Sequence, residues 1–289
     1  KALAEVFHAD IWGGRTEKYD ALWKSNIGSD KWTIPACASP NFVFSRHFSR
    51  LEEGYAAGIP INELMPLNGV GMVTARDSFS IGTREHLISQ FSKFVASPHD
   101  ETSLHASFPV ARKTGWSILT AHEKLQNTDD LSKLLNPIAY RPFDYREIFY
   151  HDDVVWRTVR KVMPHLASDG GFGICFNRSV EEKRSYTDIF VFDRMIQHHS
   201  LSLKEVNYIA PLYLYPSEQD LDQSRRVNFD PKLWKRLQTL AAHPSHGTPD
   251  EVQCFDYIYG VLHCPAYRAT YAEFLKIDFP RILWPATPD

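Results

Sequence analysis

The sequence has 289 residues, of which 43% are hydrophobic and 23% are charged, a balance that is typical of globular proteins and excludes an extended disordered chain. No apolar run approaches the roughly 20 residues that a membrane-spanning helix needs. The formal net charge of −3 counts against a small autonomous nucleic-acid-binding module, because such modules usually carry an obvious basic excess.

The beginning of the chain and its cysteines favour a cytoplasmic piece of a longer protein. The sequence starts at Lys1 without an initiator Met, and Lys1 to His8 has neither the apolar core nor the cleavage site of a secretion signal. The four cysteines are far apart and too few to crosslink a chain of this size: Cys37, Cys175, Cys254 and Cys264. We therefore expect reduced thiols and a cytoplasmic location.

The first 137 residues show mixed signals. Residues 1–80 are rich in turn formers, which predicts short strands and loops such as an apolar stretch at Asn41 to Phe44. A helix is predicted from about Arg84 to Ala96, where Thr83 can cap the first turn and apolar side chains recur at helical spacing. Residues 100–114 are polar and irregular, which is typical of a linker, and a second short helix is predicted over residues 129–135.

The second half of the chain changes from strand patterns to helix patterns. Aromatic or β-branched runs bounded by turn residues predict strands at residues 138–143, 146–150, 172–177, 189–192 and 210–215. Helices are predicted to start at Asp230 with Pro231, after a capping box of Thr248 with Glu251, and near Pro265, the last running to about Leu275.

These patterns predict a mixed α/β (α+β) fold with two lobes. We expect a mainly antiparallel or mixed sheet core flanked by helices. The expected division is an N-terminal lobe of residues 1–100, a linker with a short helix at 101–137, and a β-rich domain with C-terminal helices at 138–289.

Motifs for catalysis, cofactors and metals are missing from the sequence. An amino methyltransferase needs an Asn/Asp-Pro-Pro-Tyr/Phe loop and a glycine-rich cofactor turn, and the nearest strings, at residues 136–140 and 169–173, do not meet this pattern. The P-loop, the H-E-x-x-H zinc motif and the G-x-S-x-G nucleophile elbow are also absent from the sequence. We therefore predict no catalytic, cofactor-binding or metal-binding residues, and keep a stand-alone hydrolase as an alternative.

The segment from Tyr140 to Lys161 interleaves arginine and lysine with aromatic residues. Guanidinium groups fork onto phosphates or onto the O6 and N7 atoms of guanine, while aromatic rings pack on sugars and bases, so this pattern suits nucleic acid. The alternative is a pair of edge strands in which Arg141 and Arg146 form ion pairs with nearby acidic residues such as Asp144.

Several strings resemble the C-terminal specificity region of type ISP restriction-modification enzymes, which are single-polypeptide enzymes. The matching strings are Y-R-P-F-D-Y-R (Tyr140 to Arg146), W-R-T-V-R-K-V-M (Trp156 to Met163), the strand ending in P-L-Y-L-Y-P (Ser202 to Pro216), and the run from Tyr257 to Ile282. They span about half of the chain in the family's order. Two weaker strings, Asp10 to Leu22 and Gly71 to Asp77, look like the family's passage out of the methyltransferase domain.

The resemblance implies a DNA target-recognition domain whose catalytic partners lie upstream in a longer polypeptide. In that family one chain holds a nuclease, an ATP-dependent translocase, an adenine-N6 methyltransferase and then this region. The implied cofactors of the full-length enzyme are S-adenosylmethionine, ATP and Mg, with none in this piece. The implied partners are double-stranded DNA and the upstream methyltransferase domain. Besides a hydrolase, a protein-interaction scaffold without DNA contact remains an alternative.

The residues predicted to face DNA come from the aromatic and basic segment and from the loop after the strand at 172–177. Asp144 is included because it can hold an arginine in place. In the family that loop commonly carries Arg-Gln where this chain has Arg178 and Ser179, a departure that fits a region where members read different sequences. The predicted set is Arg141, Asp144, Arg146, Arg157, Arg160, Lys161, Asn177, Arg178 and Ser179.

Overall fold

The computed structural model describes residues 4–11, 13–26, 28, 32–35, 49–110, 115–181, 183–217 and 219–288. These form two compact units, Lys1–Ala56 and Ala57–Asp289. The first unit contains α1 (Arg15–Lys24), α2 (Ser49–Ala56) and an antiparallel bridge between His8 and Thr33. It is more helical than its turn-rich sequence predicts, and the strand expected at residues 41–44 lies outside the described residues.

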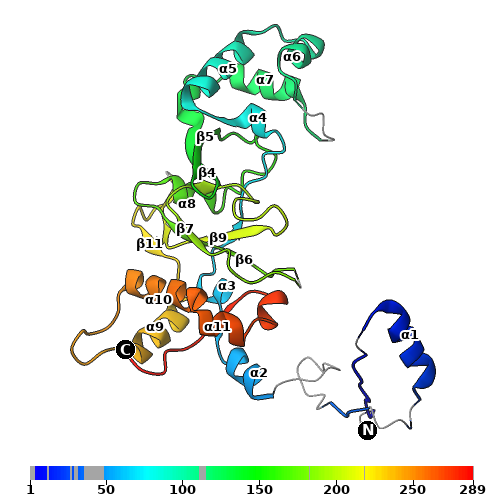
Figure 1. The fold of residues 1–289 in the computed structure, drawn as a ribbon. Helices are drawn as coiled ribbons and strands as arrows, with labels where there is room; N and C mark the ends of the chain where they lie inside the picture. Colours follow the sequence, from blue (N-terminus) through cyan, green and yellow to red (C-terminus); the bar gives the residue numbers. More distant parts are fainter. Residues whose placement is uncertain are drawn as a thin grey trace. The chain divides into compact units, whose positions relative to one another are not determined.

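One sheet of the second unit is built on a long antiparallel hairpin, β4 to β5 (Figure 1). The strands that flank this hairpin are short. The strand order is β3-β5-β4-β8, in which β8 runs parallel to β4 and the other neighbours are antiparallel. The bounds are β3 (Ile81–Gly82), β4 (Leu135–Arg141), β5 (Asp144–Phe149) and β8 (Met195–Ile196). The two long strands confirm the predicted pair at 138–143 and 146–150.

A group of helices packs against the open end of this hairpin, where Leu135 at the start of β4 lies opposite Phe149 at the end of β5 (Figure 1). The packing is aromatic, since the ring of Phe91 stacks on that of Phe149 at 3.6 Å between centroids. These contacts place the helices and the hairpin in one unit. The elements are α4 (Asp77–Ser80), α5 (Arg84–Ala96), α6 (Glu101–Ser107), α7 (Ile118–Gln126) and the 3₁₀ turn η1 (Leu131–Leu134).

Helix α5 begins and ends where the sequence predicts. The prediction of a linker at residues 100–114 is wrong over its first half, which is helical. Thr83 caps α5 by accepting a hydrogen bond from the backbone N–H of His86 at 3.3 Å. Residues 101–107 form a helix because the Asp100 carboxylate accepts from Ser103 N–H at 2.8 Å and Leu104 is fully buried. Helix α7 was not predicted, and the helix expected at 129–135 is a single 3₁₀ turn.

The other four-stranded sheet has the order β2-β9-β6-β7, and all its pairs are antiparallel. Every residue of β6 is buried, which explains its continuous apolar run. One core joins this sheet, the hairpin sheet and helix α8, through side chains such as Ile138, Cys175 and Ile209. The bounds are β2 (Gly69–Val70), α8 (Met163–Ala167), β6 (Gly173–Asn177), β7 (Phe190–Phe192) and β9 (Asn207–Pro211).

The C-terminal region is helical, as predicted. Asp230 caps α9 with hydrogen bonds of 3.0 Å from the N–H groups of Lys232 and Leu233, whereas the capping box of α10 uses Asp250 with Gln253, two residues later than predicted. The bounds are α9 (Pro231–Leu240), α10 (Glu251–His263), α11 (Pro265–Thr270) and the 3₁₀ turn η2 (Phe274–Lys276).

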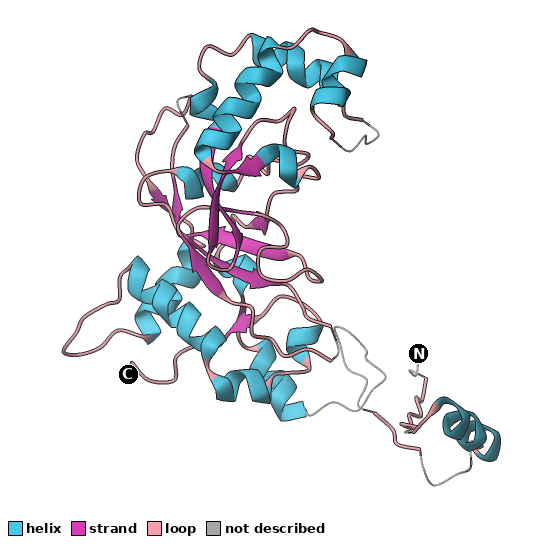
Figure 2. Cartoon of the chain, turned by 45° about the horizontal axis from the view of Figure 1, so that its top comes forward, coloured by secondary structure: helices cyan, strands magenta, loops and turns pink. Residues whose placement is uncertain are grey.

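Two small strand pairs and a short helix complete the second unit. They are β1 (Ile59–Pro60) with β12 (Arg281–Ile282), β10 (Tyr213–Leu214) with β11 (Arg226–Val227), and α3 (Ile61–Leu64). The fold is mixed α/β, with mainly antiparallel strands between groups of helices (Figure 2). Among the described residues, none of the helices has the length and hydropathy required to cross a membrane.

Candidate nucleic-acid interface

The tip of the β4–β5 hairpin projects beyond its neighbouring strands. Strand β8 pairs with β4 only at Ile138 and Ala139, and β3 pairs with β5 only at Glu147 and Ile148. Residues 140–146 therefore form a two-stranded ribbon that has no further strand beside it among the described residues. Three predicted residues, Arg141, Asp144 and Arg146, lie on this ribbon, and Arg141 pairs directly with Asp144 across it.

Three guanidinium groups stack on two tyrosine rings at this tip. The Cζ atoms of Arg141 and Arg146 lie 4.0 and 4.5 Å from the centroid of the Tyr140 ring. Arg194, next to the start of β8, lies 4.2 Å from the ring of Tyr145. Stacking of a guanidinium on an aromatic face is attractive and fixes its orientation. We name this group the hairpin surface: Tyr140, Arg141, Phe143, Asp144, Tyr145, Arg146 and Arg194.

The Asp144 carboxylate holds Arg146 with two hydrogen bonds. The Nε and Nη2 groups of Arg146 donate to the two carboxylate oxygens at 2.8 and 2.7 Å. This pairing raises the pKa of Arg146 and lowers the pKa of Asp144. Because arginine has five N–H donors, the Nη1 group and one Nη2 hydrogen remain for another partner. The ion pair that the alternative interpretation predicts therefore exists, but it leaves Arg146 able to donate outward.

Arg141 and Arg194 are held in similar ways. Arg141 Nη1 donates to the Tyr140 carbonyl at 2.6 Å and to the Gln197 side chain at 3.5 Å. Arg194 donates to both oxygens of Asp193, at 2.7 and 3.0 Å. The cationic groups of the surface are thus oriented before any ligand arrives.

Tyr140 anchors the hairpin surface to the interior. Its hydroxyl donates to Asp77 at 2.8 Å, and Asp77 also accepts a hydrogen bond from Thr74. Burial, together with the bond to Asp77, raises the pKa of Tyr140. The ring on which Arg141 and Arg146 stack is therefore fixed at its far end.

A hollow of about 610 Å³ lies beside the hairpin. Arg84 at the start of α5 joins Arg146 and Arg194 in lining it, with Asp144 and Glu147 as the acidic members. Cations from three separate elements therefore meet at one open surface.

The predicted residues Arg157, Arg160 and Lys161 lie on the segment that follows β5, away from the tip of the hairpin. The backbone of Arg157 forms a bridge with Val73, and its side chain is exposed. Arg160 donates to Asp152 at 2.7 Å, and Lys161 lines a separate hollow of about 420 Å³. Burial opposes ionisation of Asp152, but hydrogen bonds from Thr158 and Arg160 outweigh it and lower its pKa.

The predicted residues at the end of β6 divide into one interior and two outer positions. Asn177 is 1% exposed, its side-chain oxygen accepts from Asn207 at 2.6 Å, and its carbonyl accepts from the Tyr186 hydroxyl at 2.6 Å. Ser179 is half-buried. Arg178 is exposed and forms an ion pair of 2.6 Å with Asp278. Asn177 therefore holds the loop from inside, while Arg178 lies on its outer side.

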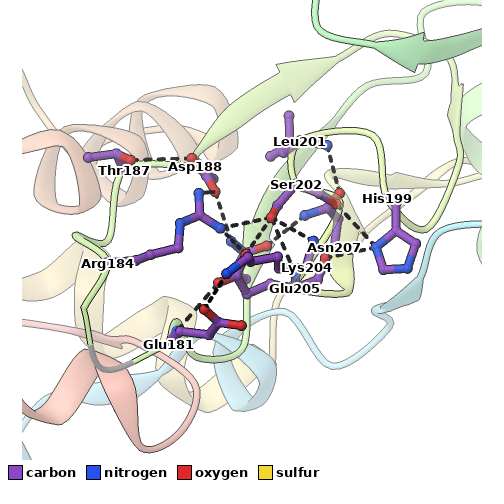
Figure 3. A network of polar contacts seen from close by, with 11 residues as sticks. Glu181, Arg184, Thr187, Asp188, His199, Leu201, Ser202, Lys204, Glu205 and Asn207 are labelled. Atoms are coloured by element: carbon purple, nitrogen blue, oxygen red, sulfur yellow. Dashed lines mark hydrogen bonds and ion pairs between the residues drawn. The ribbon is translucent and has the colours of Figure 1, made fainter.

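A network of polar contacts holds this loop against the segment before β9 (Figure 3). Arg184 donates to Ser202 at 2.8 Å, to Asp188 at 3.1 Å, and to the carboxylate of Glu205, whose side chain is 8% exposed. Lys204 adds an outer ion pair with Glu181 at 2.8 Å. The loop lacks regular structure, but its conformation is fixed by these bonds.

Three of the described residues other than glycine adopt positive φ angles, and each lies within two positions of an arginine in the sequence. They are Ala75 (φ 60°), Phe143 (φ 64°) and Val159 (φ 51°). Such conformations are disfavoured for residues with a Cβ atom and cluster at functional sites. Two of the three lie in the segment that the sequence singles out, from Tyr140 to Lys161.

The sequence reasoning missed Arg194, which belongs to the hairpin surface, and Gln197, which accepts a hydrogen bond from Arg141. Their position depends on the parallel pairing of β8 with β4, which local sequence patterns do not reveal. Among the described residues, no group of three or more histidine, cysteine or acidic side chains could hold a metal ion.

Comparisons with known proteins agree with this architecture. The family model of the type ISP C-terminal specificity domain matches residues 63–289. A cryo-EM structure of a DrdV–DNA complex has a TM-score of 0.62 and 19% identity, covering 93% of this chain and 27% of that one. A search of curated protein sequences gave no match.

Two further solved structures are similar. The ATP-dependent type ISP restriction-modification enzyme LlaBIII bound to DNA has a TM-score of 0.62 and 17% identity, covering 96% of this chain and 18% of that chain. A nuclease-deletion mutant of the type ISP restriction-modification enzyme LlaGI, in complex with a DNA substrate mimic, has a TM-score of 0.54 and 19% identity. The match covers 96% of this chain and 26% of that chain. The present chain thus spans between 18% and 27% of these solved chains, and the likeness establishes the fold.

Proposed function

This chain belongs to the family of type ISP C-terminal specificity domains, and from that premise we propose that it recognises a target sequence in double-stranded DNA for a restriction-modification enzyme. The observation that carries the proposal is the hairpin surface, where three arginines are oriented by tyrosine rings and by hydrogen bonds to acidic or other polar acceptors. The solved structures of similar fold are described as complexes with DNA or with a DNA substrate mimic, which supports the same partner here.

The shape of the hairpin tip suits a DNA groove. The major groove of B-DNA admits a two-stranded β-ribbon, and residues 140–146 form such a ribbon with no strand beside it among the described residues. The free N–H groups of Arg146 and Arg141 then face the edges of bases. A guanidinium group that donates to both O6 and N7 identifies guanine.

The remaining predicted residues are proposed to position the DNA. Arg157, Arg160 and Lys161 are exposed cations that suit phosphate contacts, which orient a protein on the duplex but carry no sequence information. Arg178 and Ser179 are proposed to contact DNA from the loop after β6. Asn177 is proposed to act by supporting that loop, because it is buried.

The catalytic activities are proposed to lie in other parts of a longer polypeptide. The implied parts are an upstream adenine-N6 methyltransferase and an ATP-dependent nuclease, with S-adenosylmethionine, ATP and Mg as their cofactors. LlaBIII is described as ATP-dependent, which supports this proposal. In that arrangement residues 1–100 would form the passage from the methyltransferase, residues 101–137 a connection, and residues 138–289 the recognition domain.

Selection from a random pool of DNA duplexes tests the proposal. The purified chain is mixed with the pool at low and at moderate salt, and the retained duplexes are sequenced. We expect one short asymmetric motif, together with an affinity that falls steeply as salt rises. Retained duplexes that match the input pool, or no retention at either salt, would contradict the proposal and favour the scaffold alternative. Covalent labelling by an activated-serine probe would favour the hydrolase.

A further inference from the structure

The two-residue turn at the tip of the hairpin has an unusual sequence for its geometry. Pro142 and Phe143 connect Arg141 to its partner Asp144. Proline followed by a residue with positive φ is the arrangement of a type II turn, and the second position then strongly favours glycine or asparagine. Here that position is occupied by a phenylalanine with a φ angle of 64°.

Neither the turn nor the protein interior accounts for this phenylalanine. A β-carbon at positive φ is strained, so the backbone alone would favour glycine. Phe143 is 82% exposed, and its ring lies nearly edge-on to that of Phe190, at 6.2 Å between centroids. The turn therefore holds a large apolar side chain out into solvent, in a conformation that costs free energy.

The surroundings of Phe143 identify the chemistry of its partner. Arg141 and Arg146 lie on either side of the turn, and both are oriented by stacking on Tyr140. The turn thus carries an exposed apolar ring and is flanked in sequence by two oriented guanidinium groups. This combination suits a duplex, in which base edges accept hydrogen bonds and stacked bases offer an apolar surface to the ring. Apolar wedges in architectural DNA-binding proteins, phenylalanine among them, enter between base pairs and partly unstack them.

We propose that Phe143 is a wedge that enters the base stack of the DNA held by the hairpin surface and locally unstacks one base-pair step. The inference rests on the proposed function and deepens it, because it assigns part of the specificity to how easily the target step unstacks. Pyrimidine–purine steps unstack most readily, so we expect such a step within the recognised motif.

The experiment uses a duplex that carries the motif selected by the whole chain. Each adenine is replaced in turn by 2-aminopurine, whose fluorescence rises when it loses stacking, and thymines are tested for permanganate oxidation. The wild-type chain is expected to raise both signals at one step. Phe143→Gly, which suits the backbone and removes the ring, should abolish the signals and weaken binding by about 10-fold to 100-fold, the range for loss of one base–aromatic stack.

Matched variants separate the wedge from the fold. Phe143→Asn tolerates positive φ but is polar, so it should behave like Phe143→Gly, whereas Phe143→Leu keeps an apolar wedge and should keep the unstacking signal. Leu221→Ala removes a fully exposed apolar side chain elsewhere and should leave binding unchanged. A mismatch placed at the unstacked step should tighten binding of the wild-type chain, because a mismatched base pair costs less free energy to unstack. The same mismatch should increase the affinity of Phe143→Gly by a smaller factor.

Two outcomes would overturn the inference while leaving DNA recognition intact. One is wild-type binding with no 2-aminopurine or permanganate response at any position. The other is a Phe143→Gly variant that binds and unstacks like the wild type. Failure of the wild-type chain to bind any duplex would instead refute the proposed function, and this inference with it.

Discussion

Each arginine of the hairpin surface is restrained twice, by an aromatic face and by hydrogen bonds. Arg146 is stacked on Tyr140 and held by Asp144, and Arg194 is stacked on Tyr145 and held by Asp193. These pairs are exposed, with 43% of the Arg146 side chain accessible, so their contribution to folding stability is small. Their physical effect is to orient N–H donors, which lowers the entropy cost of binding.

Replacing one of these arginines should change sequence preference. If Arg141 or Arg146 reads a guanine, its change to alanine should weaken binding by about 1 to 3 kcal/mol and relax preference at one base pair. If Arg157 or Arg160 contacts only phosphate, its change to alanine should weaken binding evenly across sequences and lower the salt slope by about one. Fluorescence anisotropy with cognate and scrambled duplexes measures both effects. Normal affinity in all four variants would show that the arginines are structural.

Asp144→Ala tests the orienting carboxylate separately. The change removes both hydrogen bonds to Arg146, so it should mimic part of the Arg146→Ala defect without removing a DNA contact. A thermal melt serves as the control, since the fold should be preserved. Unchanged DNA binding in Asp144→Ala, or a defect that appears only with a collapsed melt, would contradict the orienting role.

The residues of the ribbon were predictable, whereas those that reach it from other elements were not. Arg141, Asp144 and Arg146 are close in sequence and share a hairpin, so an interleaved motif reveals them. Arg194 reaches Tyr145 through the pairing of β8 with β4. Asn177 was predicted as a surface residue because it ends a strand, but its buried bond to Asn207 depends on the pairing of β6 with β9.

At the scale of elements, the loop after β6 is fixed by a charged network rather than by backbone pairing (Figure 3). Glu205 is almost buried and depends on Arg184, which also bonds to Asp188 and Ser202. Removing the cation that pairs with a buried carboxylate strongly destabilises the folded state. The loop that carries Arg178 is therefore sensitive to a change at Arg184.

Arg184→Ala should lower the free energy of unfolding by about 2 to 3 kcal/mol, from the cost of leaving a buried charged group unpaired. The value is below that of a fully buried pair because 33% of the Arg184 side chain is exposed. The double change Arg184→Met with Glu205→Leu should recover much of the loss, because it removes both charges. Urea unfolding measures the midpoints, and a double variant no more stable than Arg184→Ala would contradict this account.

Local signals explain which elements were predictable. Helix α5 has a threonine cap and a regular apolar face, so both of its ends could be predicted from the sequence. Helix α6 is short and mostly polar, and it is stabilised by burial of Leu104 within the aromatic core, a contact that is distant in sequence. Whether such a short helix forms depends more on tertiary packing than on helix propensity.

At the scale of the whole second unit, partly buried histidines should make stability depend on pH. Burial lowers the pKa values of His151, His165, His198 and His263. In addition, His165 Nδ1 accepts a hydrogen bond from Tyr215 N–H at 3.0 Å, which requires this nitrogen to be unprotonated. Folding therefore favours neutral histidine at these positions.

The expected result is a loss of stability as the pH falls below about 6.5, the pKa of histidine in an unfolded chain. Below that value the unfolded chain binds protons that the folded chain does not, so stability is full above it and decreases towards the lower folded pKa values. Melting temperatures between pH 7.5 and 5.5 measure this. His165→Asn keeps an acceptor without titrating and should reduce the slope, whereas a wild-type melting temperature independent of pH would contradict the account.

The fold class could be predicted because most strands and helices have clear local patterns. The order of strands in the two larger sheets could not, since β2 pairs with β9 and β8 pairs with β4 across long stretches of sequence. Those pairings bring the recognition elements together, so the site follows from topology as much as from motifs.

The central claim is that the hairpin surface reads bases in a DNA target. Selection from the random duplex pool, repeated with the wild-type chain and with Arg146→Ala, tests it most directly. The account predicts that both select the same asymmetric motif, except that the variant loses its preference at one base pair. Identical motifs from the two proteins, or no motif from the wild type, would contradict it.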